Sequence, residues 1–144
     1  MVDIEDIRGI ATQVRQAMDD LMTNEEIHPK WIPFGIFPKA CCGDMSIILA
    51  THFKNSGFEL ADYICGCHIE DGRSHAWLRL DGICIDITAD QFDFASYPKV
   101  IVEYEEDYPL SKIFKTERLP SKYEIDNASL SDMYNKIKEK LSAK

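Results

Sequence analysis

Apolar residues recur at helical spacing near both ends of the chain. In the first part of the sequence they are Ile4, Ile7, Ile10, Ala11, Val14, Met18 and Leu21. In the last part they are Leu130, Met133, Tyr134, Ile137 and Leu141. Residues three or four apart share one face of a helix. The pattern predicts an amphipathic helix over 4–21, capped by Asp3, and another over about 130–141, capped by Asn127 or Ser129.

A third predicted helix begins near Asp44 and is apolar on nearly every side. Its residues 45–50 read MSIILA, and Gly57 provides the stop. A helix without a polar face is buried, so this helix is expected at the centre of the molecule. The segment before it, 23–40, contains three prolines and is predicted to be extended and irregular.

Three strands are predicted after the central helix, over 60–70, 73–80 and 83–88. Each is rich in β-branched or aromatic residues, and the pairs Asp71-Gly72 and Asp81-Gly82 separate them. Asp-Gly between apolar runs favours a two-residue hairpin turn, because both residues tolerate positive φ. We therefore expect an antiparallel meander, with a further strand near 100–104. The stretch 105–126 has no clear pattern.

The composition is that of an ordinary globular chain. Hydrophobic residues make up 45% and charged residues 28% of 144 residues, a length that suits one α+β domain over 1–144. The net charge of −9 disfavours binding to nucleic acid or to anionic lipid. No apolar stretch approaches the roughly 20 residues of a membrane span. The first ten residues do not resemble a secretory signal, so a cytoplasmic location is predicted.

Five cysteines occur in the chain, at positions 41, 42, 65, 67 and 84. An odd number without a secretory signal predicts free thiols rather than a disulfide framework. Cys65 and Cys67, followed by His68, are only part of a zinc ligand set. We therefore expect neither a metal nor another cofactor.

Cys41 and Cys42 lie where the irregular segment meets the central helix. The first turn of a helix has unpaired backbone N–H groups and a partial positive charge. Both stabilise a thiolate, and the N–H groups also stabilise a developing oxyanion. A cysteine at this junction is equally compatible with a small buried residue at a tight turn.

The second hairpin relates His75 to Asp86. If Asp81-Gly82 is a two-residue turn, Trp77 faces Asp86 across the hairpin. Facing residues, and residues two apart on one strand, lie on the same face of a sheet. His75, Trp77 and Asp86 then share a face, with His75 and Asp86 within side-chain reach. The carboxylate would orient the imidazole and stabilise its protonated form.

Three short motifs occur in order within about residues 40–92. They are Cys42-Gly43-Asp44 at a helix start, His75-Ala76-Trp77 on a strand and Asp86-Ile87-Thr88 on the next strand. This order resembles the transglutaminase-like branch of the papain-like cysteine peptidase superfamily, which has C-x-[DE], H-A-W and D-x-T motifs. The resemblance implies a papain-like fold, in which a central helix packs on an antiparallel sheet.

The same resemblance implies a function. Cys42 would be the nucleophile, His75 the general base and Asp86 the orienting acid of a catalytic triad. The chain would be a thiol-dependent acyl hydrolase or transferase, acting on an amide bond of a peptide or protein partner. Peptidase, deamidase and transglutaminase-type chemistry all fit, and the oligomeric state is left open.

Three residues are candidates for contact with the substrate. Trp77 shares the face of His75. Trp31 lies between prolines, where an aromatic side chain either lines a cleft or anchors a loop. Gln91 follows the Asp86 strand and is either a polar residue of the site or a surface residue.

Two other functions fit the same residues. If Asp71-Gly72 is also a two-residue turn, His68 faces His75, and with Asp86 they would form the metal site of a hydrolase. The chain could instead be a non-catalytic protein-binding module that uses its acidic surface. Reactivity of the Cys42 thiol separates the thiol enzyme from the module, and loss of turnover to a chelator identifies the metal enzyme.

Overall fold

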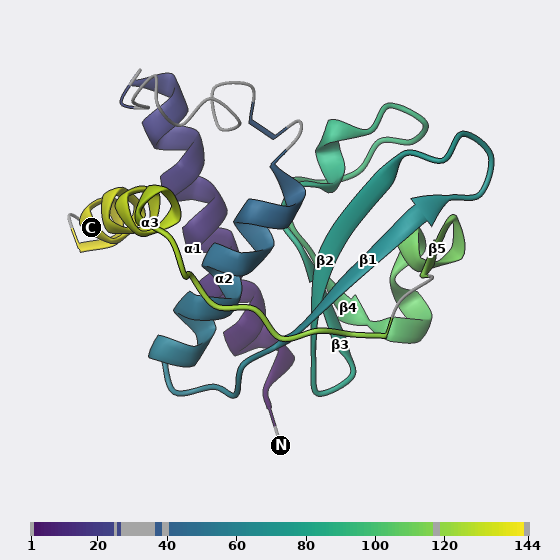
Figure 1. The fold of residues 1–144 in the computed structure, drawn as a ribbon, viewed down its shortest axis with the longest axis horizontal. Coiled ribbons are helices and arrows are strands. Elements are labelled where there is room, and N and C mark those ends of the chain that lie inside the picture. Colours follow the sequence, from purple (N-terminus) through teal and green to yellow (C-terminus); the bar gives the residue numbers. More distant parts are fainter. Residues whose placement is uncertain (1, 25, 27–36, 39–40, 117–118, 143–144) are drawn as a thin grey trace.

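The computed structural model describes residues 2–24, 26, 37–38, 41–116 and 119–142. Within them the chain forms the helices α1 (Ile4–Thr23), α2 (Cys42–Asn55) and α3 (Ala128–Ser142). The strands are β1 (Asp62–His68), β2 (Ser74–Leu80), β3 (Ile83–Asp86), β4 (Ile101–Tyr104) and β5 (Phe114–Thr116). All pairings are antiparallel, in the order β4-β3-β2-β1-β5. The predicted α+β class is confirmed (Figure 1).

Side-chain caps set the starts of the outer helices. Asp3 accepts a hydrogen bond from the N–H of Glu5 at 2.9 Å at the start of α1, as predicted. At the start of α3, the Asn127 side chain accepts the N–H of Leu130 at 2.9 Å. Of the two predicted caps, Asn127 is therefore the one that is used.

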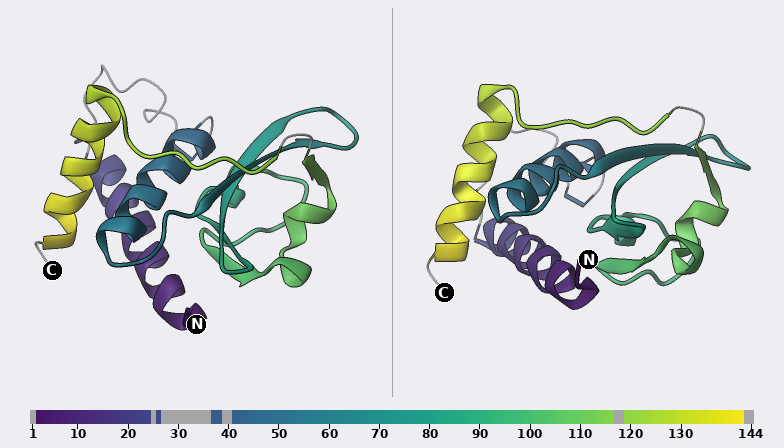
Figure 2. Two further views of the ribbon diagram at one scale, coloured as in Figure 1. Left: turned by 60° about the horizontal axis from the view of Figure 1, so that its bottom comes forward. Right: turned by 90° about the horizontal axis from the view of Figure 1, so that it is seen from below.

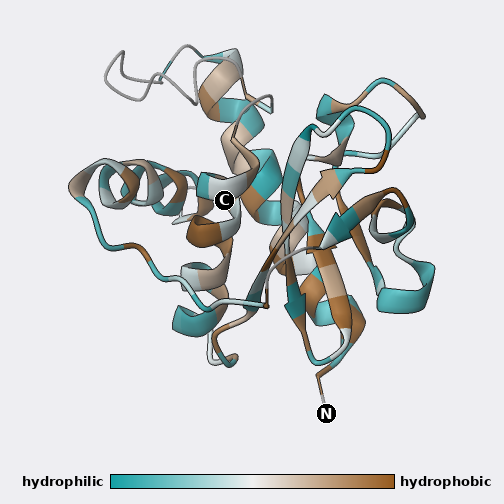
Figure 3. Ribbon diagram, turned by 45° about the vertical axis from the view of Figure 1, so that its right-hand side comes forward, coloured by the Kyte–Doolittle hydropathy of each residue, from teal (hydrophilic) through white to brown (hydrophobic). Residues whose placement is uncertain are grey.

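The α2 helix packs directly on the sheet, which α1 also contacts. It begins at Cys42, two residues earlier than predicted, and Gly57 follows its end with a φ of 97°. That backbone conformation favours glycine and ends the helix. The helix packs against β2, whereas α1 packs against α3 and β4. Apolar residues run along α2 and along the strands beside it (Figure 3).

Buried side chains form one cluster on each face of the sheet. The first joins all three helices to residues such as Leu78 and Ile85. The second lies on the opposite face and includes Trp77, Cys84 and Tyr108. Figure 2 shows the three helices on one side of the molecule and the segment between β4 and β5 on the other. Alternation along β2 and β3 decides which cluster each side chain joins.

The second hairpin has the predicted register. Leu80 pairs with Ile83, and Leu78 pairs with Ile85. Asp81 and Gly82 have φ values of 52° and 76°, the positive values that a two-residue turn of this kind requires. The face shared by His75 and Asp86 follows from this register.

The first hairpin has a longer loop than predicted. His75 pairs with Gly66, and the loop 69–72 is closed by the N–H of His68, which donates to the carbonyl of Arg73 at 2.7 Å. The Asp71 carboxylate accepts the N–H of Arg73 at 3.0 Å, and this local bond holds the wider turn. The prediction that His68 faces His75 is wrong.

Part of the unpatterned stretch 105–126 supplies the strand at one edge of the sheet. It forms the short helices η3 (Glu105–Asp107) and η4 (Pro109–Lys112), then β5, which pairs with β1. Ser121 next forms an isolated bridge to Tyr63 before the chain reaches α3. Among the described residues, no helix is both long enough and apolar enough to cross a membrane.

Candidate functional site

Cys42 is the first residue of α2 and is partly exposed. The N–H of Met45 is bonded to the carbonyl of Cys41 at 2.8 Å, so the N–H groups of residues 42–44 have no acceptor within the helix. Cys41 itself is fully buried, and burial raises the pKa of its thiol to about 12. Of the two adjacent cysteines, only Cys42 is suited to ionise.

Two hydrogen bonds reach the Cys42 thiol. One joins it to the His75 imidazole, and the other comes from the backbone N–H of Ala76 on β2. Burial by itself would raise the pKa of Cys42, but these two bonds and the charge of His75 outweigh burial and lower it. The thiol is thus held as a thiolate at a pH where a free thiol is protonated.

The imidazole of His75 is buried and oriented by Asp86. Its Nε2 lies 2.7 Å from Oδ2 of Asp86. Because Asp86 holds Nε2, the nitrogen that remains for Cys42 is Nδ1. Burial lowers the pKa of His75, but the Asp86 carboxylate and the Cys42 thiolate outweigh it and raise the pKa to about 9. Thiolate and imidazolium therefore stabilise each other.

Asp86 keeps its charge although its side chain is fully buried. Burial raises the pKa of this carboxyl, but the charge of His75 and hydrogen bonds from three groups lower it below its usual value. Besides His75, Tyr108 Oη donates to Oδ2 at 2.6 Å, and the N–H of Thr88 donates to Oδ1 at 3.0 Å. Both oxygens have donors, as a buried carboxylate requires.

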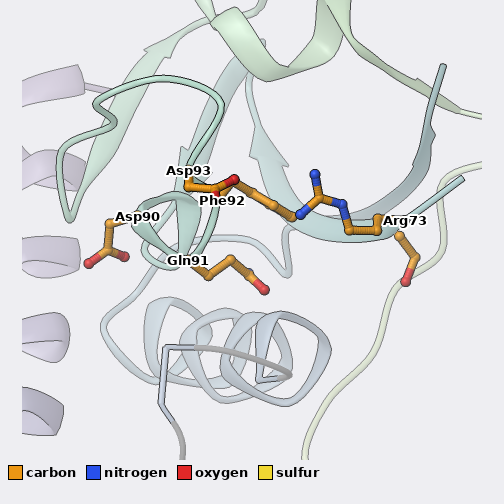
Figure 4. A pocket seen from close by; sticks show the side chains of 6 residues that line it. Arg73, Asp90, Gln91, Phe92 and Asp93 are labelled. Atoms are coloured by element: carbon orange, nitrogen blue, oxygen red, sulfur yellow. The ribbon is translucent and has the colours of Figure 1, made fainter. Parts of the chain in front are cut away.

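Gln91 lies beside the Cys42–His75 pair. Its Nε2 donates to the carbonyl of Thr88 at 3.0 Å and lies 3.5 Å from Nδ1 of His75. It also lines a pocket of about 670 Å³ that contains Arg73, Ser74, Asp90, Phe92 and Asp93. Gln91 and Arg73 extend toward this space from different elements (Figure 4). This position fits the interpretation of Gln91 as a polar residue of the site better than the interpretation as a surface residue.

Of the two tryptophans predicted to contact the substrate, the structure describes only Trp77. Trp77 is 2% exposed, and its ring centroid lies 5.8 Å from that of His75 and 5.2 Å from that of Tyr108. It supports the imidazole within the second cluster and borders a different pocket, next to Arg79. Trp31 lies outside the described residues.

His68 does not join His75 in a metal site. Its ring packs on Phe114, and its Nδ1 accepts the N–H of Glu70 at 3.2 Å. Among the described residues, no group of three His, Cys, Asp or Glu side chains is arranged to hold a metal ion. All five cysteines lie among the described residues and none forms a disulfide, which confirms the prediction of free thiols.

The sequence pattern missed the groups that complete the site. Tyr108 falls in the stretch 105–126, for which the pattern gave no prediction. The N–H donors of Ala76 and Thr88 are backbone groups that every residue type offers. The one available signal was Asp86 itself, because a buried carboxylate on an apolar strand needs further donors.

The site combines a thiolate, an imidazolium and a buried carboxylate in one hydrogen-bonded series. Such a series supplies a nucleophile and a proton donor side by side. A comparison of the chain with protein-family models, with curated proteins and with solved structures finds no match. The geometry of the site itself is therefore what indicates a function.

Proposed function

We propose that the chain is a thiol-dependent acyl hydrolase or transferase with the triad Cys42, His75 and Asp86. One observation carries the proposal: the thiol at the start of α2 is bonded to an imidazole whose other nitrogen lies 2.7 Å from a buried carboxylate. The same arrangement supports a papain-like, transglutaminase-like fold, because the central helix bears the thiol and the adjoining strands bear the His and the Asp.

The first half of the reaction forms a thioester. The Cys42 thiolate attacks the carbonyl carbon of the substrate, and the carbonyl electrons move to oxygen. The N–H of Cys42, which has no acceptor within α2, and the amide of Gln91 beside His75 would receive that oxyanion. The His75 imidazolium then gives its proton to the leaving nitrogen, the carbon–nitrogen bond breaks, and the amine departs.

The second half releases the acyl group. Water or a second amine attacks the thioester, and His75 takes the proton that the attacking group loses. Attack by water yields a carboxylic acid, and attack by an amine yields a new amide. In both cases the carbon–sulfur bond breaks and the thiolate of Cys42 returns beside the imidazolium.

A peptide or protein is the proposed substrate. The pocket next to Gln91 is open on the outer surface, where Arg73, Ser74 and Asp93 are exposed. Exposed polar groups of both charges suit the backbone and side chains of a polypeptide better than a purely apolar ligand. The scissile amide would lie between this pocket and Cys42.

The test is site-resolved alkylation of the five cysteines with iodoacetamide as a function of pH. We expect Cys42 to react at pH values well below the pKa of a free thiol, roughly 8.5. It should lose this reactivity in His75→Ala. His52→Ala, which changes a histidine near the other end of α2, should leave Cys42 unchanged. Buried Cys41 and Cys84 serve as unreactive internal references.

Turnover completes this test. Peptide amides and thioesters should be consumed by the wild type in the presence of a chelator, and not by Cys42→Ser. If Cys42 titrates like an ordinary thiol in the wild type, the proposal is wrong. A non-catalytic binding module would then be the better account of the chain.

A further inference from the structure

Two hydrogen bonds converge on one oxygen of Asp86. Oδ2 lies 2.7 Å from Nε2 of His75 and 2.6 Å from the hydroxyl of Tyr108. The second oxygen, Oδ1, receives only the backbone N–H of Thr88 among the bonds within the described residues. His75, Asp86 and Tyr108 are all at most 2% exposed, so bulk water does not screen these bonds.

The chain holds the Tyr108 ring firmly in this position. Tyr108 links η3 to η4, and its N–H donates to the carbonyl of Glu105 at 3.3 Å. On the other side, the hydroxyl of Ser111 donates to the carbonyl of Tyr108 at 2.9 Å. The ring packs against Trp77. The hydroxyl is therefore delivered to Asp86 by a restrained backbone and a packed ring.

We infer that Tyr108 is a positioning residue of the proposed site, whose hydroxyl fixes the Asp86 carboxylate and regulates how strongly that carboxylate holds the His75 imidazolium. This inference rests on the proposed function. Tyr108 is not among the residues that line the pocket beside Gln91, and its hydroxyl bonds to Asp86, so the hydroxyl would act through Asp86.

The direction of the effect follows from sharing of charge. A donor on Oδ2 stabilises the carboxylate and leaves less of its charge to attract His75. Removing the hydroxyl should therefore raise the pKa of His75 and strengthen the His75–Asp86 pair. A more tightly held imidazolium gives up its proton less readily, so the step that protonates the leaving amine should slow.

The other titratable groups around the pair do not obscure this effect. Cys42 faces His75 from α2, and Cys84 on β3 and Tyr97 face Asp86. Burial raises the pKa of Cys84 to about 12, and it also raises the pKa of Tyr97. Both groups therefore stay neutral through neutral and mildly alkaline pH. Cys84 and Tyr97 therefore add no change of charge to the titration of His75.

The test is an NMR titration of the His75 ring in Tyr108→Phe, with the signal assigned by its loss in His75→Gln. We expect the midpoint to rise from about 9 by roughly one pH unit. Tyr134→Phe is the matched control, because Tyr134 is also buried and its hydroxyl lies 2.8 Å from Nδ1 of His52. This control should leave the His75 midpoint unchanged.

A second variant tests the same inference in the opposite direction. Tyr108→3-fluorotyrosine keeps the ring and makes the hydroxyl a stronger donor, so the His75 midpoint should fall. It also remains informative if Tyr108→Phe does not fold. Unchanged midpoints in the variants that fold would overturn the inference and leave Tyr108 with packing alone. That outcome is distinct from failure of the proposed function, which is judged from Cys42 reactivity in the wild type.

Discussion

Asp86 carries its charge in a place where burial alone would neutralise it. The carboxylate is stabilised by the imidazolium of His75, the hydroxyl of Tyr108 and the N–H of Thr88. In return, it raises the pKa of His75. The thiolate of Cys42 exists above the lowered pKa of Cys42, and the imidazolium exists below about pH 9. The reactive pair of thiolate and imidazolium is therefore present at pH values between the pKa of Cys42 and the pKa of His75.

Asp86→Asn should abolish the pH range in which the Cys42 thiolate and the His75 imidazolium coexist. The amide keeps the size of the side chain but removes the charge that raises the pKa of His75. Burial would then lower that pKa, and the pKa of Cys42 would rise because the imidazolium is lost. We expect alkylation of Cys42 at pH 7 to slow by about 10-fold to 100-fold. Asp93→Asn, which changes an exposed acid of the adjacent pocket, should not alter the rate. An unaltered rate in Asp86→Asn would contradict the argument.

At the scale of elements, α1 is tied to the segment that follows β3. Arg15 is 4% exposed on α1, and its guanidinium binds both carboxylate oxygens of Asp90 at 2.7 and 2.8 Å. It also donates to the carbonyl of Ile87 at 2.8 Å. These bonds hold the turn between Asp86 and Gln91 against the helix. The helix layer thereby positions part of the site.

Arg15→Met should destabilise the chain strongly, because it leaves Asp90 and the Ile87 carbonyl without their buried cation. We expect a loss of about 3–5 kcal/mol in the free energy of unfolding, measured by urea denaturation. Lys99→Met removes a different cation that bonds to Asp19 from the surface, where its side chain is 64% exposed. That variant should lose less than about 1 kcal/mol. Equal losses in the two variants would show that burial of Arg15 is not the cause.

At the scale of the whole molecule, the sheet separates two apolar clusters. Met133 of α3 lies in the cluster on the helix side, and Cys84 of β3 lies in the other. Both side chains are fully buried. Because β2 and β3 contribute side chains to both clusters, loss of packing in one cluster should also destabilise the other.

Met133→Ala tests whether the two sides unfold together. It should lower the free energy of unfolding by about 2–5 kcal/mol, recorded by far-ultraviolet circular dichroism. Alkylation of Cys84, which requires unfolding, should report the same loss although Cys84 lies across the sheet. Asn135→Ala, on the exposed face of α3, should change either signal by no more than about 0.5 kcal/mol. A loss confined to the helix signal would contradict a single cooperative domain.

Local rules in the sequence determined much of the architecture. The spacing of apolar residues sets α1 and α3, because a helix places residues three or four apart on one face. Asp81 and Gly82 determine the register of the second hairpin, because two residues with positive φ close a tight turn. That register places His75 and Asp86 on the same face before any tertiary contact is known.

The tertiary structure alone decided the remaining parts of the site. The first hairpin took a wider loop because the Asp71 carboxylate bonds to Arg73, and a turn signal does not reveal that competition. Tyr108 reaches Asp86 from a segment without any pattern. The Ala76 N–H reaches Cys42 because α2 begins beside β2. Such contacts join residues far apart in the chain, and a periodic pattern records only the neighbours of each residue along one element.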